Sequence, residues 1–559
     1  MDRSPSHAAE TLFRVKDDFF PCEATLSGEH RLDAAVESYS REKRESYYRE
    51  VISLAGAVTE SSFSLLSGGE KVDLIIALTE SLKAFRLLYE EREWERDPRL
   101  YLVPVASALD AMARREYAPP EERLEALMAR LAKMPAHLQE ARKLLRPLSA
   151  LRIKEAIPLS FGIKLSLEEC ASCFAILPSG KLEKLQGLVR EAGTSLLEFR
   201  EYLAKELLPA VPPDLPEASS DLTAFLKIDC IRDCGIERLR EMAEEAFEEA
   251  EDALRRKAGE AGFRGEDWNT LLEKMGEHHP SIESLHDAYR NGMRNAEHFA
   301  HGEIADSLGM GSVEVRTAPF HIRLRFPSAS FAAAGGLEKE QKTFIFVTPI
   351  VTGYHNEEEQ LAAHCFGRIR HAALHEGAPG HHLQCYYASR HESYAVRRVR
   401  SRITSEGWTL YCEDMAEKKG YLEGESLLSL IEARLWRAAR LKILTGMQSG
   451  VLTEHGARQF LMDRLGASAE VASAETARII TGARDVVAYF LGRETLQTLK
   501  SRFLQRSREK SERDFHFMVL QSGVIPLGLM PLMMGMEPGE EVLEHKRAAL
   551  VTALKDHTV

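Results

Sequence analysis

The sequence contains no long apolar run. No stretch of about 18 consecutive apolar residues, the least that a membrane-spanning helix needs, occurs among its 559 residues. The mean hydropathy is −0.27. The first residues, MDRSPSHAAETLFRV, lack the apolar core of a secretory signal. We therefore expect a cytoplasmic protein with no membrane span and no membrane partner.

An excess of basic residues is also missing. Lysine and arginine number 73, against 86 aspartates and glutamates, so the formal net charge is −13. Proteins that bind nucleic acids usually carry a basic excess or a basic stripe. No nucleic-acid partner is therefore predicted. Hydrophobic residues at 44% and charged residues at 28% are instead typical of an ordinary globular chain.

Cysteines are few, with eight in the whole chain, which excludes a disulfide scaffold. Cys170 and Cys173 are three residues apart, and Cys230 and Cys234 are four apart. Together these two pairs could hold a structural zinc ion. Both pairs lie in helix-like sequence and no CxxC…CxxC signature is present, which favours cysteines that simply pack in the core.

The chain from about residue 32 to residue 300 has the pattern of consecutive helices. Apolar residues recur there at steps of three and four, in a background of Leu, Ala, Glu, Lys and Arg. Breaks are predicted at residues 67–69, 119–120, 178–180 and 209–216, where glycines and prolines gather. We expect residues 1–305 to form a helical region that covers a cleft.

Residues 306–559 are predicted to form the region that carries the site, in one fold with the helices before it. Short strands are expected at residues 313–316, 320–326 and 343–347, where apolar residues alternate with polar ones or form a short run. A glycine-rich turn at 334–336 separates the last two. The predicted fold is therefore mostly α, with a small β-sheet next to the helix that carries the site.

That helix is predicted to begin at Asn356. An asparagine is a favourable N-cap, and the three glutamates that follow it suit the positive end of the helix dipole. One apolar face would continue through the helix, formed by Leu361, Cys365, Phe366, Ile369, Ala372 and Ala373. The helix leads directly into the most informative segment of the chain.

Residues 374–383 read LHEGAPGHHL. In the zinc-protease motif HExxH, two histidines at i and i+4 ligate the metal, and the glutamate beside the first acts as general base. His375 and Glu376 match the first half of this motif. Pro379 occupies position i+4, so the second ligand must come from elsewhere.

Two later histidines could supply it. If Pro379 and Gly380 form a bulge that absorbs two residues, His381 takes the place of the i+4 ligand. On an unbroken helix, His382 would lie about 10 Å along the axis from His375, which is too far for a shared metal. The sequence therefore predicts His375 and His381 as ligands. Packing alone would account poorly for three histidines, a glutamate and a Pro-Gly break in so short a segment.

Three segments of the chain resemble one bacterial family. HEGAPGHHLQ at residues 375–384 and EGWTLYCE at 406–413 are similar to the HExxPGHHLQ and EGWxLYxE motifs of the domain-of-unknown-function family DUF885. FHFMVLQSGVIPL at 515–527 is similar to its closing FHxxxLxxGxxPL motif. This family is grouped with gluzincin-type metallopeptidases. The resemblance implies a large two-lobed helical body with a long cleft and one zinc ion at its floor.

The resemblance also implies roles for individual residues. Glu406 corresponds to the third gluzincin ligand, which leaves the fourth metal position to water. Tyr489 is the first candidate for the donor that stabilises the oxyanion, with Tyr411 and His382 as alternatives. Trp408 and Tyr411 could line the substrate site.

Arg478 survives from a second family motif and could bind a substrate carboxylate. A structural salt bridge to Glu475 or Asp485 would explain this arginine equally well.

The chain departs from the family at two other motifs. In RAARLKILTGMQ, residues 437–448, Leu444 stands in place of an aspartate and Gln448 in place of a histidine. In RIITGARDVVAYFLG, residues 478–492, the family's Pro-Gly-Gln is lost. Loss of the aspartate could weaken metal binding if it orients a ligand. These changes leave hydrolysis as the prediction and the substrate open.

The predicted function is a zinc-dependent metallohydrolase that acts on short peptides. A metal-activated water would attack the scissile carbonyl, and Glu376 would serve as general base. Residues 343–347 could pair with the substrate main chain by strand addition. A zinc amide hydrolase for a non-peptide or modified-peptide substrate is the closest alternative. A catalytically silent, metal-stabilised binding scaffold is the other.

Overall fold

A computed structural model describes residues 5–556, except 214, 216–221, 227–234, 265–266, 308, 354–355, 507–508 and 537–538. Helices account for 72% of the structure and strands for 2%. The prediction of a mostly α fold with one small sheet is therefore confirmed. Cys230 and Cys234 lie outside the described residues, so the four-cysteine site is a prediction that the structure does not address. Cys170 is buried, and Cys173 is exposed.

The first part of the chain is helical throughout the described residues. Its helices are α1 (Pro5–Phe19), α2 (Pro21–Leu26), α3 (Arg41–Ala57), α4 (Glu60–Ser64), α5 (Gly68–Phe85), α6 (Glu93–Arg96), α7 (Val103–Arg114), α8 (Pro120–Leu131), α9 (Met134–Leu144), α10 (Ala150–Ser172), α11 (Ser179–Tyr202), α12 (Leu222–Phe225), α13 (Ile236–Glu260), α14 (Trp268–Gly276) and α15 (Leu285–Glu303).

A small sheet and further helices follow. They are β1 (Glu314–Thr317), α16 (Phe320–Arg323), β2 (Ala329–Ala332), β3 (Phe344–Val347), α17 (Glu357–Ala362), α18 (Phe366–Glu376), α19 (His381–Ser389), α20 (Tyr394–Arg398), α21 (Arg402–Lys418), α22 (Glu425–Gln448), α23 (Glu454–Leu465), α24 (Ala469–Thr481), α25 (Ala483–Arg506), α26 (Glu512–Gln521), α27 (Met530–Met533) and α28 (Gly539–Asp556).

Three of the four predicted breaks, those at residues 67–69, 119–120 and 178–180, coincide with helix starts. Ser67 caps α5, with its side chain accepting from the Glu70 N–H and the Glu70 side chain accepting from the Ser67 N–H. This reciprocal pair satisfies two of the free donors at a helix N-terminus. Pro120 is the first residue of α8, and Pro178 directly precedes α11. Proline lacks an N–H and has a fixed φ, which suits it to these positions.

The sheet has the strand order β1-β3-β2, with β3 parallel to β1 and antiparallel to β2. All four residues of β3 are buried. Ile345 and Val347 pack on one face with residues of α15 and α18, while Phe344 and Phe346 occupy the other face. A strand covered on both faces has a continuous apolar sequence, which is why residues 343–347 could be identified.

The strand predicted at residues 320–326 is wrong. Residues 320–323 form the short helix α16, which begins after Pro319. The buried His321 bonds through its main-chain N–H and its Nδ1 to the Ser166 hydroxyl, at 3.0 and 2.9 Å. The Arg323 guanidinium binds the Ala318 carbonyl and Glu169. These contacts with α10 and the preceding loop override the alternating pattern. The strand β2 was not predicted, because its sequence ASFA offers little pattern.

The single helix predicted from Asn356 is in fact two. Helix α17 ends at Ala362, and α18 begins at Phe366. Between them, Nδ1 of the buried His364 shares a hydrogen bond with the Tyr289 hydroxyl at 3.0 Å. The Phe366 N–H donates to the His278 carbonyl. Phe366 is exposed rather than part of an apolar face. Contacts with α15 and the loop before it therefore fix a turn that the periodicity does not show.

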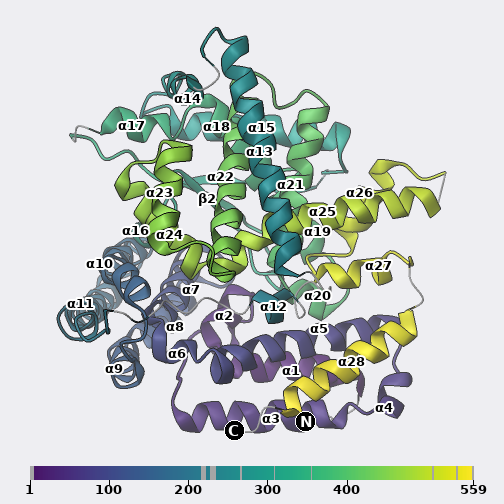
Figure 1. Cartoon of the computed structure of the whole chain (residues 1–559). Coiled ribbons are helices and arrows are strands. Elements are labelled where there is room, and N and C mark those ends of the chain that lie inside the picture. The colour runs from purple at the N-terminus through teal and green to yellow at the C-terminus, as the bar shows by residue number, and fades with distance from the viewer. Residues whose placement is uncertain are drawn as a thin grey trace.

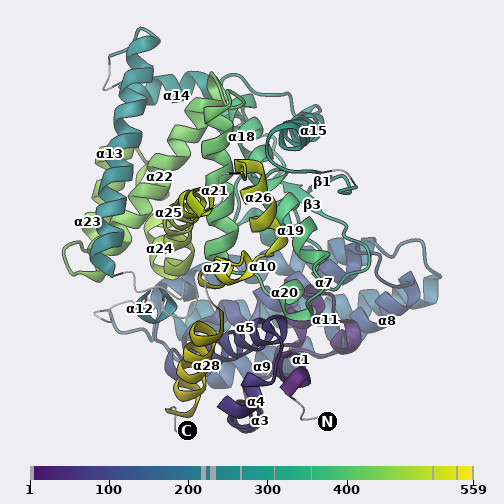
Figure 2. The same ribbon diagram turned by 90° about the vertical axis from the view of Figure 1, so that its right-hand side faces the viewer.

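Helices from distant parts of the chain lie side by side (Figures 1 and 2). The last helix, α28, packs on α5, and both ends of the chain lie at the same end of the molecule. Helix α13 packs along α22, and α15 along α18. Each of these pairs joins residues 1–305 to residues 306–559. No described helix is long and apolar enough to cross a membrane.

Helices α21 and α25 come unusually close together. A Cβ at Gly407 would lie 2.4 Å from the Gly492 carbonyl carbon, and one at Gly492 would lie 2.2 Å from the Ile403 oxygen. Only glycine fits at either position, since real Cβ atoms do not approach other atoms so closely. This contact fixes the position of α21, which carries Glu406 next to Gly407.

Candidate metal centre

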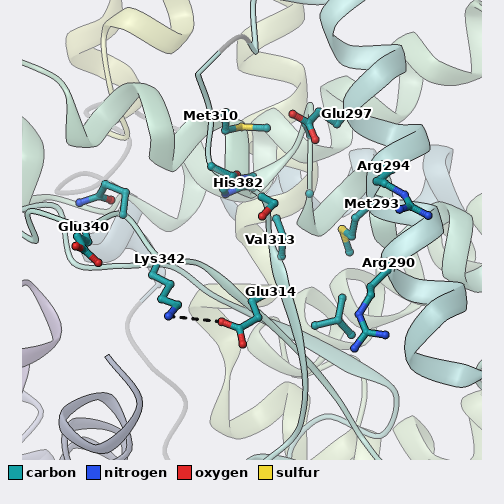
Figure 3. A pocket seen from close by; sticks show the side chains of 16 residues that line it. Arg290, Met293, Arg294, Glu297, Met310, Val313, Glu314, Glu340, Lys342 and His382 are labelled. Atoms are coloured by element: carbon teal, nitrogen blue, oxygen red, sulfur yellow. Dashed lines mark hydrogen bonds and ion pairs between the residues drawn. The ribbon is translucent and has the colours of Figure 1, made fainter. Parts of the chain in front are cut away.

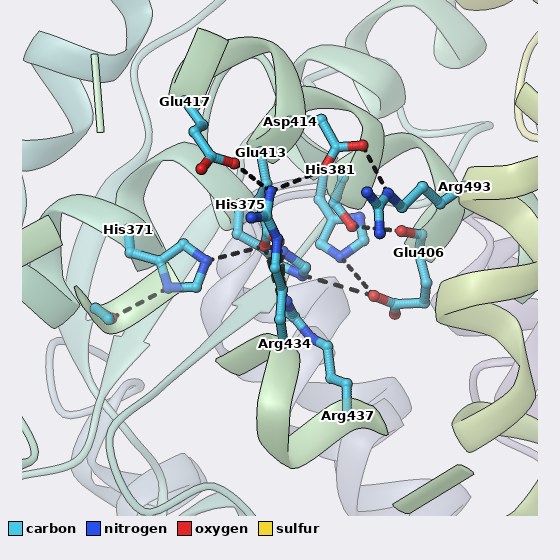
Figure 4. Close-up of polar contacts among 12 residues, drawn as sticks. His371, His375, His381, Glu406, Glu413, Asp414, Glu417, Arg434, Arg437 and Arg493 are labelled. Atoms are coloured by element: carbon cyan, nitrogen blue, oxygen red, sulfur yellow. Dashed lines mark hydrogen bonds and ion pairs between the residues drawn. The ribbon is translucent and has the colours of Figure 1, made fainter. Parts of the chain in front are cut away.

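Three buried side chains from three helices meet at one point (Figure 4). His375 lies near the end of α18, His381 begins α19, and Glu406 lies in the second turn of α21. Glu406 Oε2 is 3.5 Å from His375 Nε2 and 3.6 Å from His381 Nε2. Each residue offers one ligand atom, and these atoms all lie within 4.8 Å of one another. This is the group of potential metal ligands that the described residues contain.

The loop formed by residues 377–380 places the second histidine. The predicted helical bulge is wrong, because α18 ends at Glu376 and a new helix begins at His381. The loop contains a cis peptide bond before Pro379, whose carbonyl accepts a hydrogen bond from Trp408 Nε1 at 2.8 Å. A Cβ on Gly380 would lie 1.8 Å from the His375 oxygen. A glycine at this position therefore lets the chain double back and bring His381 beside His375.

His382 points away from this group. Its Nε2–H donates to the Gly311 carbonyl at 2.8 Å, and its buried Nδ1 has no partner among the described residues. The hydrogen bond ties α19 to the segment that leads into β1. The structure thus brings His381, and not His382, to Glu406.

The donor set fits a zinc ion. Two histidines and a glutamate form the protein ligands of several catalytic zinc sites. Glu406 Oε2 is buried and makes no hydrogen bond that meets geometric criteria, although it faces both Nε2 atoms. A buried carboxylate oxygen without such a partner is costly, and a cation between it and the two nitrogens would satisfy all three.

A second carboxylate orients the first ligand (Figure 4). His375 Nδ1 donates to Glu413 Oε1 at 2.7 Å, which leaves Nε2 directed at Glu406. Glu413 also accepts from His371 Nε2 at 3.0 Å and from Arg437 Nη1 at 2.9 Å. A carboxylate behind a ligating histidine fixes the tautomer and the ring orientation of that ligand. This network is fully buried except for part of Arg437.

Two members of this network, His371 and Glu413, have local signals in the sequence. His371 is one helical turn before His375, so both rings lie on the same face of α18. Glu413 follows Glu406 by two turns on α21 and closes the EGWTLYCE motif. Arg437, which comes from α22, had no local signal.

The carboxylates control the charge of His375. Burial lowers the pKa of His375, but the neighbouring carboxylates of Glu406 and Glu413 raise it to about 10. Burial raises the pKa of Glu413, yet Arg437 and His371 lower it well below its usual range. The carboxylates therefore stay ionised while His375 holds a proton that a metal at Nε2 must displace.

We expect zinc binding to strengthen as the pH rises. Since His375 gives up about one proton when the metal binds, the apparent affinity should increase about tenfold per pH unit between about pH 6 and about pH 8, and level off near the pKa of about 10. Competition with a chelator whose own titration is measured in the same buffers tests this. An affinity that does not change with pH would contradict the protonation of His375.

Glu376 and Tyr489 are the two further residues that were predicted to act in catalysis. Glu376 ends α18 next to His375, is half-buried, and makes no hydrogen bond or ion pair with any described residue. Tyr489 of α25 is also half-buried, and Arg437 lies 5.1 Å above its ring. The negative charge of Glu406 and burial raise the pKa of Tyr489 to about 12, so its hydroxyl stays protonated. That hydroxyl has no hydrogen-bond partner among the described residues.

Two other predicted site residues lie elsewhere. The Tyr411 hydroxyl donates to His516 Nε2 at 2.8 Å, because His516 Nδ1 donates to the Ile304 carbonyl. Tyr411 is 2% exposed, so it is a core residue and not a substrate contact. Arg478 is half-exposed on α24, with Nη1 at 3.6 Å from Glu475. The contacts of Arg478 therefore favour a structural salt bridge with Glu475 over a role in binding a substrate carboxylate.

The lost family residues do not disrupt the ligand group. Leu444 is 2% exposed and packs in the hydrophobic core. His375 takes its carboxylate partner from Glu413 instead. The concern that an aspartate missing at 444 would leave a ligand without orientation is therefore not supported by the contacts.

A cavity of about 730 Å³ lies beside the loop between α18 and α19 (Figure 3). One stripe of α15, the segment 310–315 and the loop residues Gly377 and Ala378 line it, together with His382. None of the three candidate ligands lines this cavity. It is therefore adjacent to the ligand loop but is not the space between the ligands.

Comparisons with known proteins identify the family and the fold. The family model described as "Bacterial protein of unknown function (DUF885)" matches residues 21–534. A solved structure of a candidate lipoprotein of unknown function from Shewanella oneidensis superposes with a TM-score of 0.74 at 18% identity, covering 95% of this chain and 99% of that one. A candidate lipoprotein from Colwellia psychrerythraea gives a TM-score of 0.75 at 14% identity, covering 98% and 99%. No curated protein sequence matches the chain.

Proposed function

Because the chain belongs to the bacterial family DUF885, whose function is unknown, we propose a function from the site itself. We propose that the protein is a zinc-dependent hydrolase that cleaves amide bonds, with short peptides as its substrates. The observation that carries the proposal is the meeting of His375, His381 and Glu406, with a buried carboxylate oxygen between two imidazole nitrogens.

In the proposed site, three side chains would hold the metal ion and two others orient the histidine rings. Nε2 of His375, Nε2 of His381 and Glu406 would hold the ion, and Glu413 and Ser405 fix the two rings through Nδ1, at 2.7 and 3.1 Å. When bound, zinc would supply Lewis acidity, which acidifies water and polarises a carbonyl group.

Glu376 is the proposed general base. The residue directly follows His375 at the end of α18, and its carboxylate has no competing partner among the described residues, so it is free to accept a proton from the attacking water. The same carboxylic acid can then donate that proton to the leaving amine. A carboxylate without a partner would not stabilise the fold at this position, so a purely structural role does not explain the glutamate.

Tyr489 is the proposed donor to the oxyanion. The ring lies under Arg437, and the pKa of about 12 keeps the proton on the phenol at neutral pH. A protonated hydroxyl near Glu406 can donate to negative charge that develops on the carbonyl oxygen.

The strand that could bind a peptide main chain is β2 rather than β3. The prediction that the substrate main chain pairs with residues 343–347 is wrong, because β3 is paired on both sides. The edge strand β2 lies next to the site, with the Phe331 ring 5.7 Å from that of His381. Along an antiparallel strand, residues whose main-chain groups bond to the neighbouring strand alternate with residues whose main-chain groups point away from it. The Thr348 N–H donates to the Ser328 carbonyl, so the main-chain N–H and C=O groups of Ala329 and Phe331 point to the outer edge of the sheet. An extended peptide could add there as a further strand.

The test is hydrolysis of a defined pool of short peptides, followed by mass spectrometry. The zinc-loaded protein is expected to cleave members of the pool, chelation should abolish the cleavage, and added zinc should restore it. Cleavage that persists after the metal is removed would contradict the proposal. Bound zinc without any cleavage would favour a metal-stabilised scaffold.

A further inference from the structure

The two carboxylate oxygens of Glu406 face different partners. Oε2 lies 3.5 Å from His375 Nε2 and 3.6 Å from His381 Nε2. Oε1 lies 3.6 Å from Nη1 of Arg402, which precedes Glu406 by one turn on the same face of α21. The Glu406 side chain is 6% exposed, whereas that of Arg402 is 55% exposed. One oxygen is therefore directed at the two histidines, and the other is directed at a half-exposed cation.

Asp485 of α25 holds Arg402 in this position. Arg402 Nε donates to Asp485 Oδ1 at 2.8 Å, while Nη1 is the atom that faces Glu406. The same two helices are in close contact at Gly407 and Gly492. The carboxylate of Asp485 also offsets the positive charge of Arg402, so the pair would add little net charge beside a metal ion.

Stability alone explains the pair of Arg402 and Asp485 poorly. Both side chains are about half-exposed, and exposed ion pairs contribute little to stability. Another pair, Arg493 with Asp414 at 2.6 Å, also joins α25 to α21. Only the pair of Arg402 also reaches one of the candidate ligands. This contact points to a role at the metal centre.

The direction of Glu406 Oε1 matters because a carboxylate can bind a metal through one oxygen or through both. A catalytic zinc site keeps one position open beside three protein ligands. If Glu406 bound through both oxygens, the second oxygen would take that position. Binding through Oε2 alone would leave the position to water or substrate.

We propose that Arg402 holds Glu406 Oε1 away from the metal, so that Glu406 is a ligand through Oε2 alone. Arg402 is then a positioning residue, since it contacts a ligand and not the reacting atoms. The inference rests on the proposed hydrolase function and names the side chain that keeps the site open.

X-ray absorption spectroscopy of the zinc-loaded protein tests this inference without requiring turnover. A carboxylate that binds through both oxygens brings its carbon closer to the metal than one that binds through a single oxygen. We expect one-oxygen binding in the wild type and two-oxygen binding in Arg402→Gln. Zinc affinity should fall by less than about tenfold, because the second oxygen compensates for the lost orientation.

Imidazole measures the open position directly. It is neutral, so loss of the charge of Arg402 does not by itself weaken its binding. Titration of the cobalt-loaded protein, followed by its visible spectrum, should show about 10- to 100-fold weaker binding in Arg402→Gln, the usual effect of losing a residue that orients a metal ligand. Arg402→Lys should restore part of the affinity, since lysine keeps the charge but not the planar fork.

Arg493→Gln is the matched control. It also removes an Arg–Asp pair between α21 and α25, but Arg493 contacts none of the candidate ligands. We expect this variant to keep one-oxygen binding by Glu406 and the wild-type affinity for imidazole. The same change in Arg493→Gln as in Arg402→Gln would assign the effect to helix packing and overturn the inference.

The other outcomes separate this inference from the function on which it rests. If the wild type binds no metal, the proposed function fails and the inference falls with it. If Glu406 binds through both oxygens in the wild type, or through one in Arg402→Gln, the metal site stands and the role of Arg402 is overturned. Loss of zinc from Arg402→Gln would also contradict the inference, because Arg402 would then be needed for metal binding itself.

Discussion

Replacing Glu376 by glutamine is expected to lower kcat by about 100- to 10,000-fold, the range for loss of a general base. The amide keeps the size of the carboxylate but cannot accept a proton from water. Zinc content and thermal stability should stay at wild-type values, because Glu376 ends α18 without an ion pair or hydrogen bond to any described residue. Single-turnover assays on peptides that the wild type cleaves provide the measurement.

Glu297→Gln is the control for this substitution. Glu297 is another half-buried glutamate without an ion pair among the described residues, and it lines the cavity beside α15. Its replacement should change kcat by less than about twofold, as is usual away from a reacting centre. Full activity in Glu376→Gln would rule out its role as base, and a metal-loaded protein inactive in every form would favour the scaffold.

Glu413→Gln is expected to weaken zinc binding by about 10- to 100-fold, the usual effect of losing a carboxylate behind a ligating histidine. Glu413 accepts from His375 Nδ1, from His371 and from Arg437. A neutral amide would leave the buried part of Arg437 without a counter-charge. We therefore also expect the metal-free protein to lose about 3–5 kcal/mol of unfolding free energy. Competition with a chelator and denaturant unfolding measure the two effects.

The neighbouring substitution Asp414→Asn distinguishes a specific effect of Glu413 on zinc affinity from a general effect of losing negative charge on α21. Asp414 pairs with Arg434 at 2.9 Å and with Arg493 at 2.6 Å, and it contacts none of the candidate ligands. This variant should lose some stability but keep the wild-type zinc affinity. Equal loss of affinity in both variants would show that Glu413 acts through the stability of α21 and not through His375.

The helical fold could be predicted because its signals are local. Apolar periodicity, and caps such as Ser67 and Pro120, depend only on neighbours in the sequence. The central strand β3 was visible for a related reason, since burial on both faces demands a continuous apolar run. Residues 320–326 were misassigned because their conformation depends on Ser166 and Glu169, which are far away in the sequence.

The same distinction applies to the site. His375, Glu376 and His381 lie in one motif, so their proximity follows from a short loop. The oxygen that completes the group comes from α21, and only the family resemblance pointed to Glu406. Contacts such as those of Tyr411 with His516, or of Arg402 with Asp485, join helices whose relative positions no local pattern specifies.

Zinc analysis of the purified protein, alongside His375→Ala, His381→Ala and His382→Ala, tests the central claim most directly. The wild type should bind about one equivalent of zinc, as a single three-ligand site requires. His375→Ala and His381→Ala should lose it, while His382→Ala should retain it, because His382 donates to the Gly311 carbonyl and does not face Glu406. No bound metal even after zinc is offered, or zinc retained in His381→Ala but lost in His382→Ala, would contradict the account.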